Sequence, residues 1–179
     1  MTGWTKALAG ISATLLLAVT PPAVAQQVEV VDKPQDNEVP GLDIVTVNAQ
    51  NNDRAVEVTV TFSRVLRGDL FVSVRARGTN DGVRIVSKRR PQTGDETYLL
   101  PGSFGGRGGA IRCRDLTGTW DPNAETMELR MPSRCLVRGN YGAVRFSVLT
   151  EQAGGAADVD WAPEDVTGEI DSTAWIPRG

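Results

Sequence analysis

Residues 55–62 read Ala-Val-Glu-Val-Thr-Val-Thr-Phe, an alternation of apolar and polar side chains that continues without a break from Val56. Side chains two positions apart lie on the same face of a β-strand, so Val56, Val58, Val60 and Phe62 would share one face. An amphipathic helix would instead need apolar residues at intervals of three and four. The segment therefore predicts a strand with one face buried and the other in solvent.

The same two-residue period recurs along most of the chain, between turn signals such as Arg67-Gly-Asp69 and Asp121-Pro-Asn-Ala124. A single helical turn is expected near Pro132, since proline is favoured at a helix start. Short strands separated by frequent turns are typical of antiparallel sandwiches and barrels. We therefore predict an all-β fold, an antiparallel two-sheet β-sandwich of the immunoglobulin-like or jelly-roll-like kind, with strands over 44–48, 55–62, 70–77, 83–86, 97–100, 117–120, 126–131 and 143–149.

The first 25 residues have the layout of a secretory signal peptide. Lys6 is the only charge, an apolar run covers residues 7–19, and Ala23-Val-Ala25 places small residues at the expected cleavage positions. The apolar run is shorter than the roughly 20 residues of a transmembrane helix, and no later stretch approaches that length. We expect cleavage near Ala25-Gln26 and a secreted, extracellular mature chain without a transmembrane segment.

The rest of the chain is long enough for one domain. Residues 26–42 are acidic and contain two prolines, which predicts an extended lead-in that is partly ordered at best. The sandwich domain is expected over residues 43–163. Residues 164–179 are expected to form a C-terminal tail that winds over the surface.

The two cysteines, Cys113 and Cys135, are expected to form a disulfide bond, because an even number of cysteines in an exported chain favours pairing. Closing a loop of about 20 residues would stabilise the fold by about 3 kcal/mol. A redox or zinc-binding pair is the weaker alternative, since the chain has neither a Cys-x-x-Cys spacing nor a histidine.

The charge of the chain is modest and unevenly distributed. The formal net charge is −3, and loss of Lys6 with the signal makes the mature chain more acidic, which argues against a nucleic-acid partner. Both ends are acidic and the middle is basic, so the ends could dock onto the middle, although a solvated surface is the simpler interpretation. Asp158 and Asp160 are the nearest approach to a calcium site, but a full calcium-binding loop is missing. No cofactor is expected.

Three tryptophans of the mature chain are candidate ligand contacts: Trp120, Trp161 and Trp175. Their flat apolar faces could stack on the rings of a sugar. The alternative is that they cover the core or pin the tail to it, because tryptophan is well buried on average.

Catalytic groups are harder to identify. The absence of histidine excludes the Ser-His-Asp and Cys-His mechanisms, and no Gly-x-Ser-x-Gly motif is present. A pair of carboxylates, as glycosidases use, stays open because the chain has 22 acidic residues. The sequence does not place two of them across a cleft, so no catalytic residue is assigned.

Several segments together resemble a known kind of domain. They are the Asp43-Ile44 opening strand, the Val-x-Val-x-Val-x-Phe62 strand, Met131-Pro-x-x-Cys-Leu136, Val144-Arg-Phe146 and the Asp158–Pro163 tail. Their order resembles secreted β-sandwich domains common in actinobacteria, which are largely uncharacterised. More distantly it is similar to the DOMON and family 9 carbohydrate-binding sandwiches. DOMON domains that bind haem use axial histidine or methionine, so here, without histidine, the resemblance implies the fold rather than a haem site.

These observations together favour a secreted, non-enzymatic β-sandwich that acts as a binding or interaction module. Its partner would be an extracellular glycan or protein. A carbohydrate-binding module that uses one or two of the tryptophans is the first alternative. A glycoside hydrolase-type enzyme with a carboxylate pair is the second.

Overall fold

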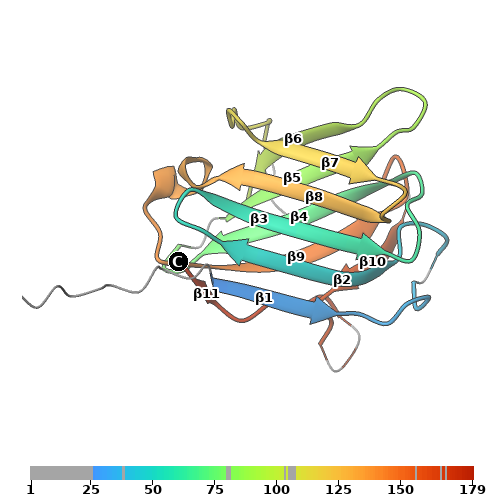
Figure 1. The fold of residues 1–179 in the computed structure, drawn as a ribbon, viewed down its shortest axis with the longest axis horizontal. Coiled ribbons are helices and arrows are strands. Elements are labelled where there is room, and N and C mark those ends of the chain that lie inside the picture. Colours follow the sequence, from blue (N-terminus) through green and yellow to red (C-terminus); the bar gives the residue numbers. More distant parts are fainter. Residues whose placement is uncertain are drawn as a thin grey trace, which may run out of the picture.

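The computed structural model describes residues 26–37, 39–79, 82–102, 104, 108–155, 157–165, 167 and 169–179. The expected signal peptide, residues 1–25, lies outside these described residues. Two antiparallel sheets face each other across one hydrophobic core (Figure 1). The predicted all-β, antiparallel two-sheet sandwich is therefore confirmed.

The sheet that we call sheet A has five strands in the order β1-β2-β3-β8-β7. Each strand pairs antiparallel with its neighbour, and the non-local pair is β3 with β8, which joins Ala55 to Pro132 in register. The strands are β1 (Gln26–Val31), β2 (Ile44–Asn51), β3 (Ala55–Phe62), β8 (Thr126–Pro132) and β7 (Thr117–Asp121).

The facing sheet, sheet B, has the order β10-β9-β4-β5-β6, and the short strand β11 also pairs with β9. The chain passes between the two sheets after β3, after β6 and after β8. The strands are β4 (Gly68–Ala76), β5 (Gly82–Arg89), β6 (Glu96–Pro101), β9 (Ala143–Glu151), β10 (Asp158–Ala162) and β11 (Ile176–Pro177).

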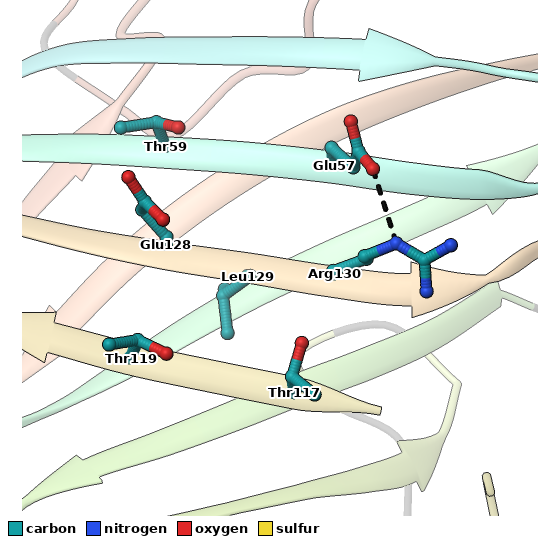
Figure 2. Close-up of a pocket in the computed structure, with 7 residues that line it drawn as sticks. All are labelled: Glu57, Thr59, Thr117, Thr119, Glu128, Leu129 and Arg130. Carbon is teal, nitrogen blue, oxygen red and sulfur yellow. Dashed lines mark ion pairs between the residues drawn. The ribbon is translucent and has the colours of Figure 1, made fainter. Parts of the chain in front are cut away.

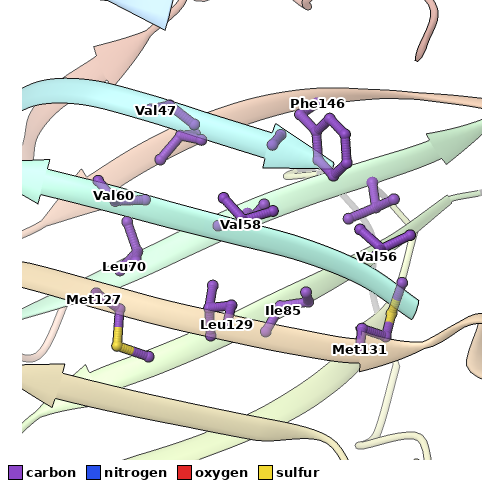
Figure 3. Packing of buried hydrophobic residues seen from close by; sticks show 14 of the residues in the cluster. Val47, Val56, Val58, Val60, Leu70, Ile85, Met127, Leu129, Met131 and Phe146 are labelled. Carbon is purple, nitrogen blue, oxygen red and sulfur yellow. The ribbon is translucent and has the colours of Figure 1, made fainter. Parts of the chain in front are cut away.

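The core lies between the sheets and is built by the alternation seen in the sequence (Figure 3). Val56, Val58, Val60 and Phe62 of β3 are at most 1% exposed. Alternate residues of β8 in the same sheet, and of β4 and β9 in the facing sheet, pack with them in the core. Figure 3 shows Leu70, Ile85 and Phe146 of sheet B against Val47, Val58, Met127, Leu129 and Met131 of sheet A.

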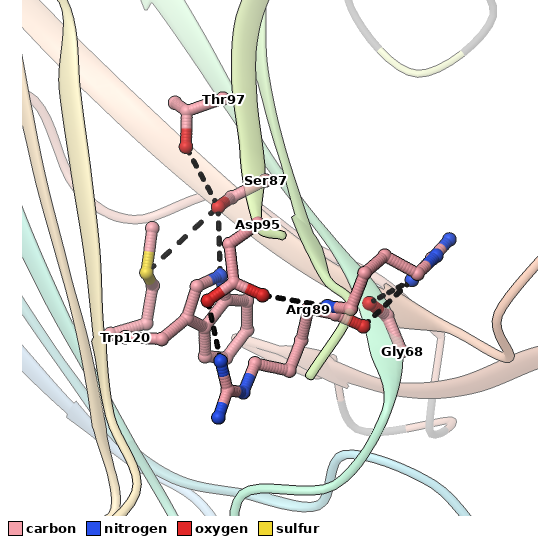
Figure 4. A network of polar contacts seen from close by, with 8 residues as sticks. Gly68, Ser87, Arg89, Asp95, Thr97 and Trp120 are labelled. Atoms are coloured by element: carbon pink, nitrogen blue, oxygen red, sulfur yellow. Dashed lines mark hydrogen bonds and ion pairs between the residues drawn. The ribbon is translucent and has the colours of Figure 1, made fainter. Parts of the chain in front are cut away.

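Polar contacts inside the sandwich join the two sheets (Figure 4). The Trp120 indole N–H of β7 donates a 3.1 Å hydrogen bond to the Ser87 hydroxyl of β5. The same hydroxyl lies 3.0 Å from the Thr97 hydroxyl of β6. Because buried polar groups are costly unless paired, these contacts fix how the β7 edge of sheet A sits on sheet B.

The prediction for residues 26–42 needs correction. Residues 26–31 are not a loose lead-in, because β1 pairs with β2 along its whole length, from Gln26 opposite Asn51 to Val31 opposite Thr46. The backbone hydrogen bonds of β1 therefore add a fifth strand to sheet A. The sequence signal was weak because only Val28 and Val30 of this strand are packed against the core.

The disulfide bond between Cys113 and Cys135 is present, as predicted. Cys135 ends the short 3₁₀ helix η1 (Ser133–Cys135), which forms the helical turn expected after Pro132, and η2 (Val137–Gly139) follows it. The bond ties the segment before β7 to the segment after β8. It lies at the end of the sandwich where both helical turns and the C-terminus are found (Figure 1).

The C-terminal segment is more firmly attached than a surface tail. Ile176 in β11 pairs with Val144 of β9 and is 3% exposed. The Asn51 side-chain amide of sheet A donates a 2.9 Å hydrogen bond to the carbonyl of Ile176. Through β11, the last residues therefore pair with β9 of sheet B, on the side that does not pair with β4, and connect it to sheet A.

The two outer faces of the sandwich differ in what covers them. On sheet B, Val86 lies on the outer face, as does its strand partner Phe71, yet the Val86 side chain is fully buried. Arg84 of the same face donates to the carbonyl of Phe104, and Ser147 hydrogen-bonds to Ser172 at 2.9 Å. These loop and tail contacts cover sheet B, whereas on sheet A the described residues leave the outer face of β3, β8 and β7 accessible to solvent.

Candidate functional site

The outer face of sheet A is polar across four neighbouring strands. None of the side chains that it presents there is buried. They are Thr46, Asn48 and Gln50 on β2, Glu57, Thr59 and Thr61 on β3, Thr126, Glu128 and Arg130 on β8, and Thr117, Thr119 and Asp121 on β7.

Strand pairing aligns part of this face into two rows of side chains across β3, β8 and β7 (Figure 2). One row is Glu57, Arg130 and Thr117, and the other is Thr59, Glu128 and Thr119. Arg130 Nε lies 3.3 Å from Glu57 Oε1 within the first row. A groove of about 330 Å³ is lined by both rows. We call it the sheet A groove.

The sheet A groove offers both kinds of hydrogen-bonding group on a rigid support. Carboxylates accept, a guanidinium donates, and threonine hydroxyls do both. Neighbouring strands lie about 4.8 Å apart, and residues two apart on one strand are about 6.8 Å apart. Such a grid suits a ligand that carries many hydroxyl groups, because each hydroxyl can meet a donor or an acceptor of the groove.

Trp120 does not serve the ligand-stacking role for which it was a candidate. It is 8% exposed, and its ring stacks on Phe62 with ring centroids 5.6 Å apart. The alternation Thr117-Gly-Thr-Trp of β7 places Trp120 on the inner face, next to Met127 on β8. Trp120 is therefore a core residue, in agreement with the alternative interpretation.

Trp161 and Trp175 lie on the other side of the sandwich, away from the sheet A groove. Trp161 on β10 pairs with Leu149 and lines a pocket of about 340 Å³. Trp175 is half-buried beside β11, with the guanidinium carbons of Arg77 and Arg145 at 5.2 and 5.0 Å from its ring. Cation–π contacts of this kind hold the tail on sheet B. The three tryptophans thus do not form one stacking platform.

The calcium candidates Asp158 and Asp160 are separated by the structure. Two residues apart on a regular strand they would share a face, but a register shift between them interrupts β10. Asp158 is exposed beside Trp161, whereas Asp160 is 3% exposed and points into the sandwich end. The pair therefore cannot act together as the sequence suggested.

Asp160 instead belongs to a set of carboxylates that we call the acidic cluster: Asp32, Asp36, Asp43, Asp160 and Glu164. Carboxylate oxygens of Asp36, Asp43 and Asp160 lie within 4.8 Å of one another, and so do those of Asp32, Asp36 and Glu164. Oxygen ligands of this kind could hold a divalent cation such as Ca²⁺. Asp160 also accepts the backbone N–H groups of Ile44 (2.6 Å) and Trp161 (2.8 Å).

Burial and mutual repulsion change the acidity of this cluster. Burial raises the pKa of Asp160 to about 7, assisted by the charges of Asp32 and Asp36 and opposed by its two backbone hydrogen bonds. Burial likewise raises the pKa of Asp32 to about 6. Near neutral pH these groups are therefore partly protonated, which lowers the repulsion inside the cluster.

The acidic cluster also shows where the two acidic ends of the chain go. Asp32, Asp36 and Asp43 come from the N-terminal region, and Asp160 and Glu164 come from the C-terminal region. Part of each end meets the other at one end of the sandwich, while Trp175 of the C-terminal tail lies against Arg77 of the basic middle of the chain. The charges of Arg89 and Arg90 in that middle pair with Asp95 and Asp69.

The sequence matches no known protein-family profile and no curated protein. None of the helices in the described part of the chain is both long and apolar enough to cross a membrane. The case for a function therefore depends on the fold and on the geometry of its surfaces.

Sequence reasoning missed the sheet A groove and all but one member of the acidic cluster. Both sets join residues from strands or loops far apart in sequence, and strand order was not evident from local patterns. One usable signal was present: the solvent-facing positions of two predicted strands carry Glu57, Thr59, Glu128 and Arg130. The sequence does not show that these positions share one surface.

Proposed function

We propose that the protein is a secreted, non-enzymatic binding module that recognises an extracellular carbohydrate through the sheet A groove. The observation that carries this proposal is the pair of polar rows, Glu57-Arg130-Thr117 and Thr59-Glu128-Thr119, on an uncovered sheet face. Hydroxyl groups of a glycan need paired donors and acceptors, and this grid supplies both. Because β-strands fix the backbone from which these side chains project, the spacing of the donors and acceptors is set before a ligand binds.

The location of the protein is part of the same proposal. A signal-like segment covers residues 1–25, and a disulfide joins Cys113 to Cys135. Disulfides persist in oxidising compartments, so the bond supports an exported protein. The secreted product is expected to have the mass of a chain that begins at Gln26.

A direct binding experiment tests the proposed function. The secreted protein is applied to an array of neutral and acidic glycans, and hits are measured by calorimetry. The variant Glu128→Ala is expected to weaken binding about tenfold or more, since a hydrogen bond to a charged group contributes about 1.5–3 kcal/mol. The variant Gln50→Ala, on the same face but outside the groove, serves as the control and should bind normally.

The outcomes separate the proposal from its alternatives. Equal affinity of the Glu128→Ala variant and the native protein would contradict the proposal, as would the absence of any glycan ligand. Loss of binding in a Trp161→Ala variant, with a sugar-dependent change in tryptophan fluorescence, would instead locate recognition at the tryptophan pocket on β10.

A hydrolase is the second candidate, because the groove lining contains two carboxylates, Glu57 and Glu128. Glycosidases act through such a pair, one residue on each side of the scissile bond. Release of reducing sugar from a bound glycan, abolished by both Glu57→Gln and Glu128→Gln, would support that candidate. Unchanged glycan after prolonged incubation would support the binding module.

A further inference from the structure

The end of the sandwich next to the disulfide gathers arginine side chains around a pocket of about 640 Å³. Five arginines line it: Arg54, Arg130, Arg134, Arg138 and Arg178. They come from the turn before β3, from β8, from η1, from η2 and from the C-terminus. Only the tertiary fold brings these five positions together. We call this site the arginine pocket.

The backbone around the arginine pocket is held in place by several contacts. The disulfide anchors η1, and Arg134 Nη2 lies 2.6 Å from Asp115 Oδ2. Arg178 donates a 2.7 Å hydrogen bond to the carbonyl of Gly139. Its guanidinium carbon also lies 5.1 Å from the ring centroid of Tyr141. Arg134 and Arg178 are thus held in place before a ligand binds, which lowers the entropy that these two side chains lose on binding.

The turn that presents Arg138 has an uncommon conformation. Val137 and Arg138 both have positive φ angles, 49° and 54°. A β-branched residue rarely adopts such an angle, and each such residue costs of the order of 1–3 kcal/mol. The fold maintains this turn at the rim of the pocket, and strained backbone of this type is concentrated at functional sites.

The charge of the pocket is not balanced by its own residues. Its lining contains two carboxylates, Asp53 and Asp115, against the five arginines. Asp53 lies 3.4 Å from Arg178, and Asp115 pairs with Arg134. In the described part of the chain, no carboxylate lies within ion-pair distance of Arg54 or Arg138. Two guanidinium groups are therefore left for an external anion.

Arg130 connects the arginine pocket to the sheet A groove, because it lines both. Its carboxylate partner, Glu57, belongs to the groove. A ligand that follows β8 along the groove would therefore meet hydroxyl-binding groups first and guanidinium groups at the end of the sheet. The two lined volumes, about 330 and 640 Å³, are of a size for sugar units.

From this continuity we infer that the ligand is an acidic polysaccharide, whose oxyanion groups bind in the arginine pocket while its hydroxyl groups bind in the sheet A groove. The inference rests on the proposed function and names its ligand class. A guanidinium group forms paired hydrogen bonds with the oxygens of a carboxylate, and it binds sulfate in a related way. Uronate and sulfated chains thus share the chemistry that the pocket recognises.

The test compares three polysaccharides that differ in charge: a polyuronate, a sulfated chain and a neutral glucan. The double variant Arg54→Gln/Arg138→Gln removes the two guanidinium groups without an ion-pair partner. It should bind acidic chains at least tenfold more weakly, with a smaller dependence of affinity on salt, and should bind the neutral chain as before. Arg67→Gln, an exposed arginine in the turn before β4, is the matched control.

The polyuronate and sulfate arms show which oxyanion is preferred, and a preference for either one supports the inference. Equal binding of acidic chains by the double variant, at an unchanged melting temperature, would overturn it. Binding of neutral chains only, sensitive to Glu128→Ala, would also overturn the inference while the proposed function stands. If no polysaccharide binds at all, the proposed function itself fails. If the Glu128→Ala variant binds acidic chains as tightly as the native protein, recognition is confined to the arginine pocket. The inferred continuity between the pocket and the sheet A groove is then contradicted.

Discussion

At the scale of single residues, Asp160 shows how a small backbone irregularity changes the role of a side chain. Its spacing from Asp158 suggested a shared ligand face, yet the register shift in β10 sends the two carboxylates to different surroundings. Asp160, itself buried, joins a partly exposed cluster of like charges and accepts hydrogen bonds from the N–H groups of Ile44 and Trp161. Its chemistry follows from these neighbours and not from its sequence motif.

The raised pKa of Asp160 predicts that stability falls as the pH rises. This group has a pKa of about 7 in the folded protein, against an ordinary value of 3.8 for an aspartic acid. Its contribution to stability is full below about pH 4 and is lost as the pH rises through about 7. The Asp32 carboxyl, with a pKa of about 6, acts in the same direction. The free energy of unfolding, measured by urea denaturation in EDTA, should fall between pH 5 and 8 by a few kcal/mol at most.

Variants show whether the acidic cluster causes this dependence. Asp160→Asn should flatten the curve, although it also removes one backbone hydrogen bond, because the amide nitrogen that replaces one oxygen cannot accept. Glu29→Gln, an exposed position on β1 outside the acidic cluster, should leave the slope unchanged. Stability that rises over the same pH range, or an equal slope in the Asp160→Asn variant, would contradict the assignment.

At the scale of elements, the approach of β7 to β6 depends on the absence of a side chain at Gly118. A Cβ atom at this position would overlap the Thr97 hydroxyl of β6 and lie 2.7 Å from the Met127 methyl. The glycine therefore lets the edge strand of sheet A lie against sheet B. Trp120, two residues on, uses this proximity to reach Ser87.

Gly118→Val is expected to lower the free energy of unfolding by about 1–3 kcal/mol, because the added side chain must displace Thr97 and Met127. Adding Thr97→Ala in the same chain should recover part of that loss, even though Thr97→Ala alone removes a contact to Ser87. Thr119→Val, on the outer face of β7, should change stability by no more than about 0.5 kcal/mol. Denaturant unfolding measures all four variants, and a neutral Gly118→Val variant would refute the argument.

At the scale of the whole molecule, the fold gathers acidic and basic side chains at different places. The acidic cluster lies at the start of β2, beside β10. The arginine pocket lies at the end of β2, where β8 runs into η1. The two sites are therefore at opposite ends of the sandwich. A protein that is acidic overall can in this way present a positive end to an anionic ligand.

The disulfide acts at this same scale, because it closes a loop with a sequence separation of 22 residues that contains the β7–β8 hairpin. The variant Cys113→Ser/Cys135→Ser should unfold with a free energy about 3 kcal/mol lower, on the chain-entropy estimate. For a domain of this size the melting temperature should fall by roughly 6–12 °C. Calorimetry measures the loss, and thiol titration of the unfolded, unreduced native protein should find no free thiol. An equally stable double variant would contradict the estimate.

The local pattern of the sequence was enough to predict the fold class, most strands and the disulfide. Alternating side chains reveal which face of a strand is buried, as Val56 to Phe62 and Val144 to Val148 show. Such patterns depend on residues next to one another, so they can be read without knowledge of the fold. They failed for β1, because only Val28 and Val30 of this edge strand are packed against the core.

The partners of each strand were decided by the tertiary structure alone. Strand order sets Thr59 beside Glu128, the bulge in β10 parts Asp158 from Asp160, and the turn at Val137 brings Arg138 to Arg54. The two-residue alternation of a strand is the same whichever strand pairs with it, so the alternation alone does not reveal the strand order. Packing between distant segments selects the arrangement, because the apolar faces of the two sheets are buried against each other. The sheet A groove and the arginine pocket form only in that arrangement.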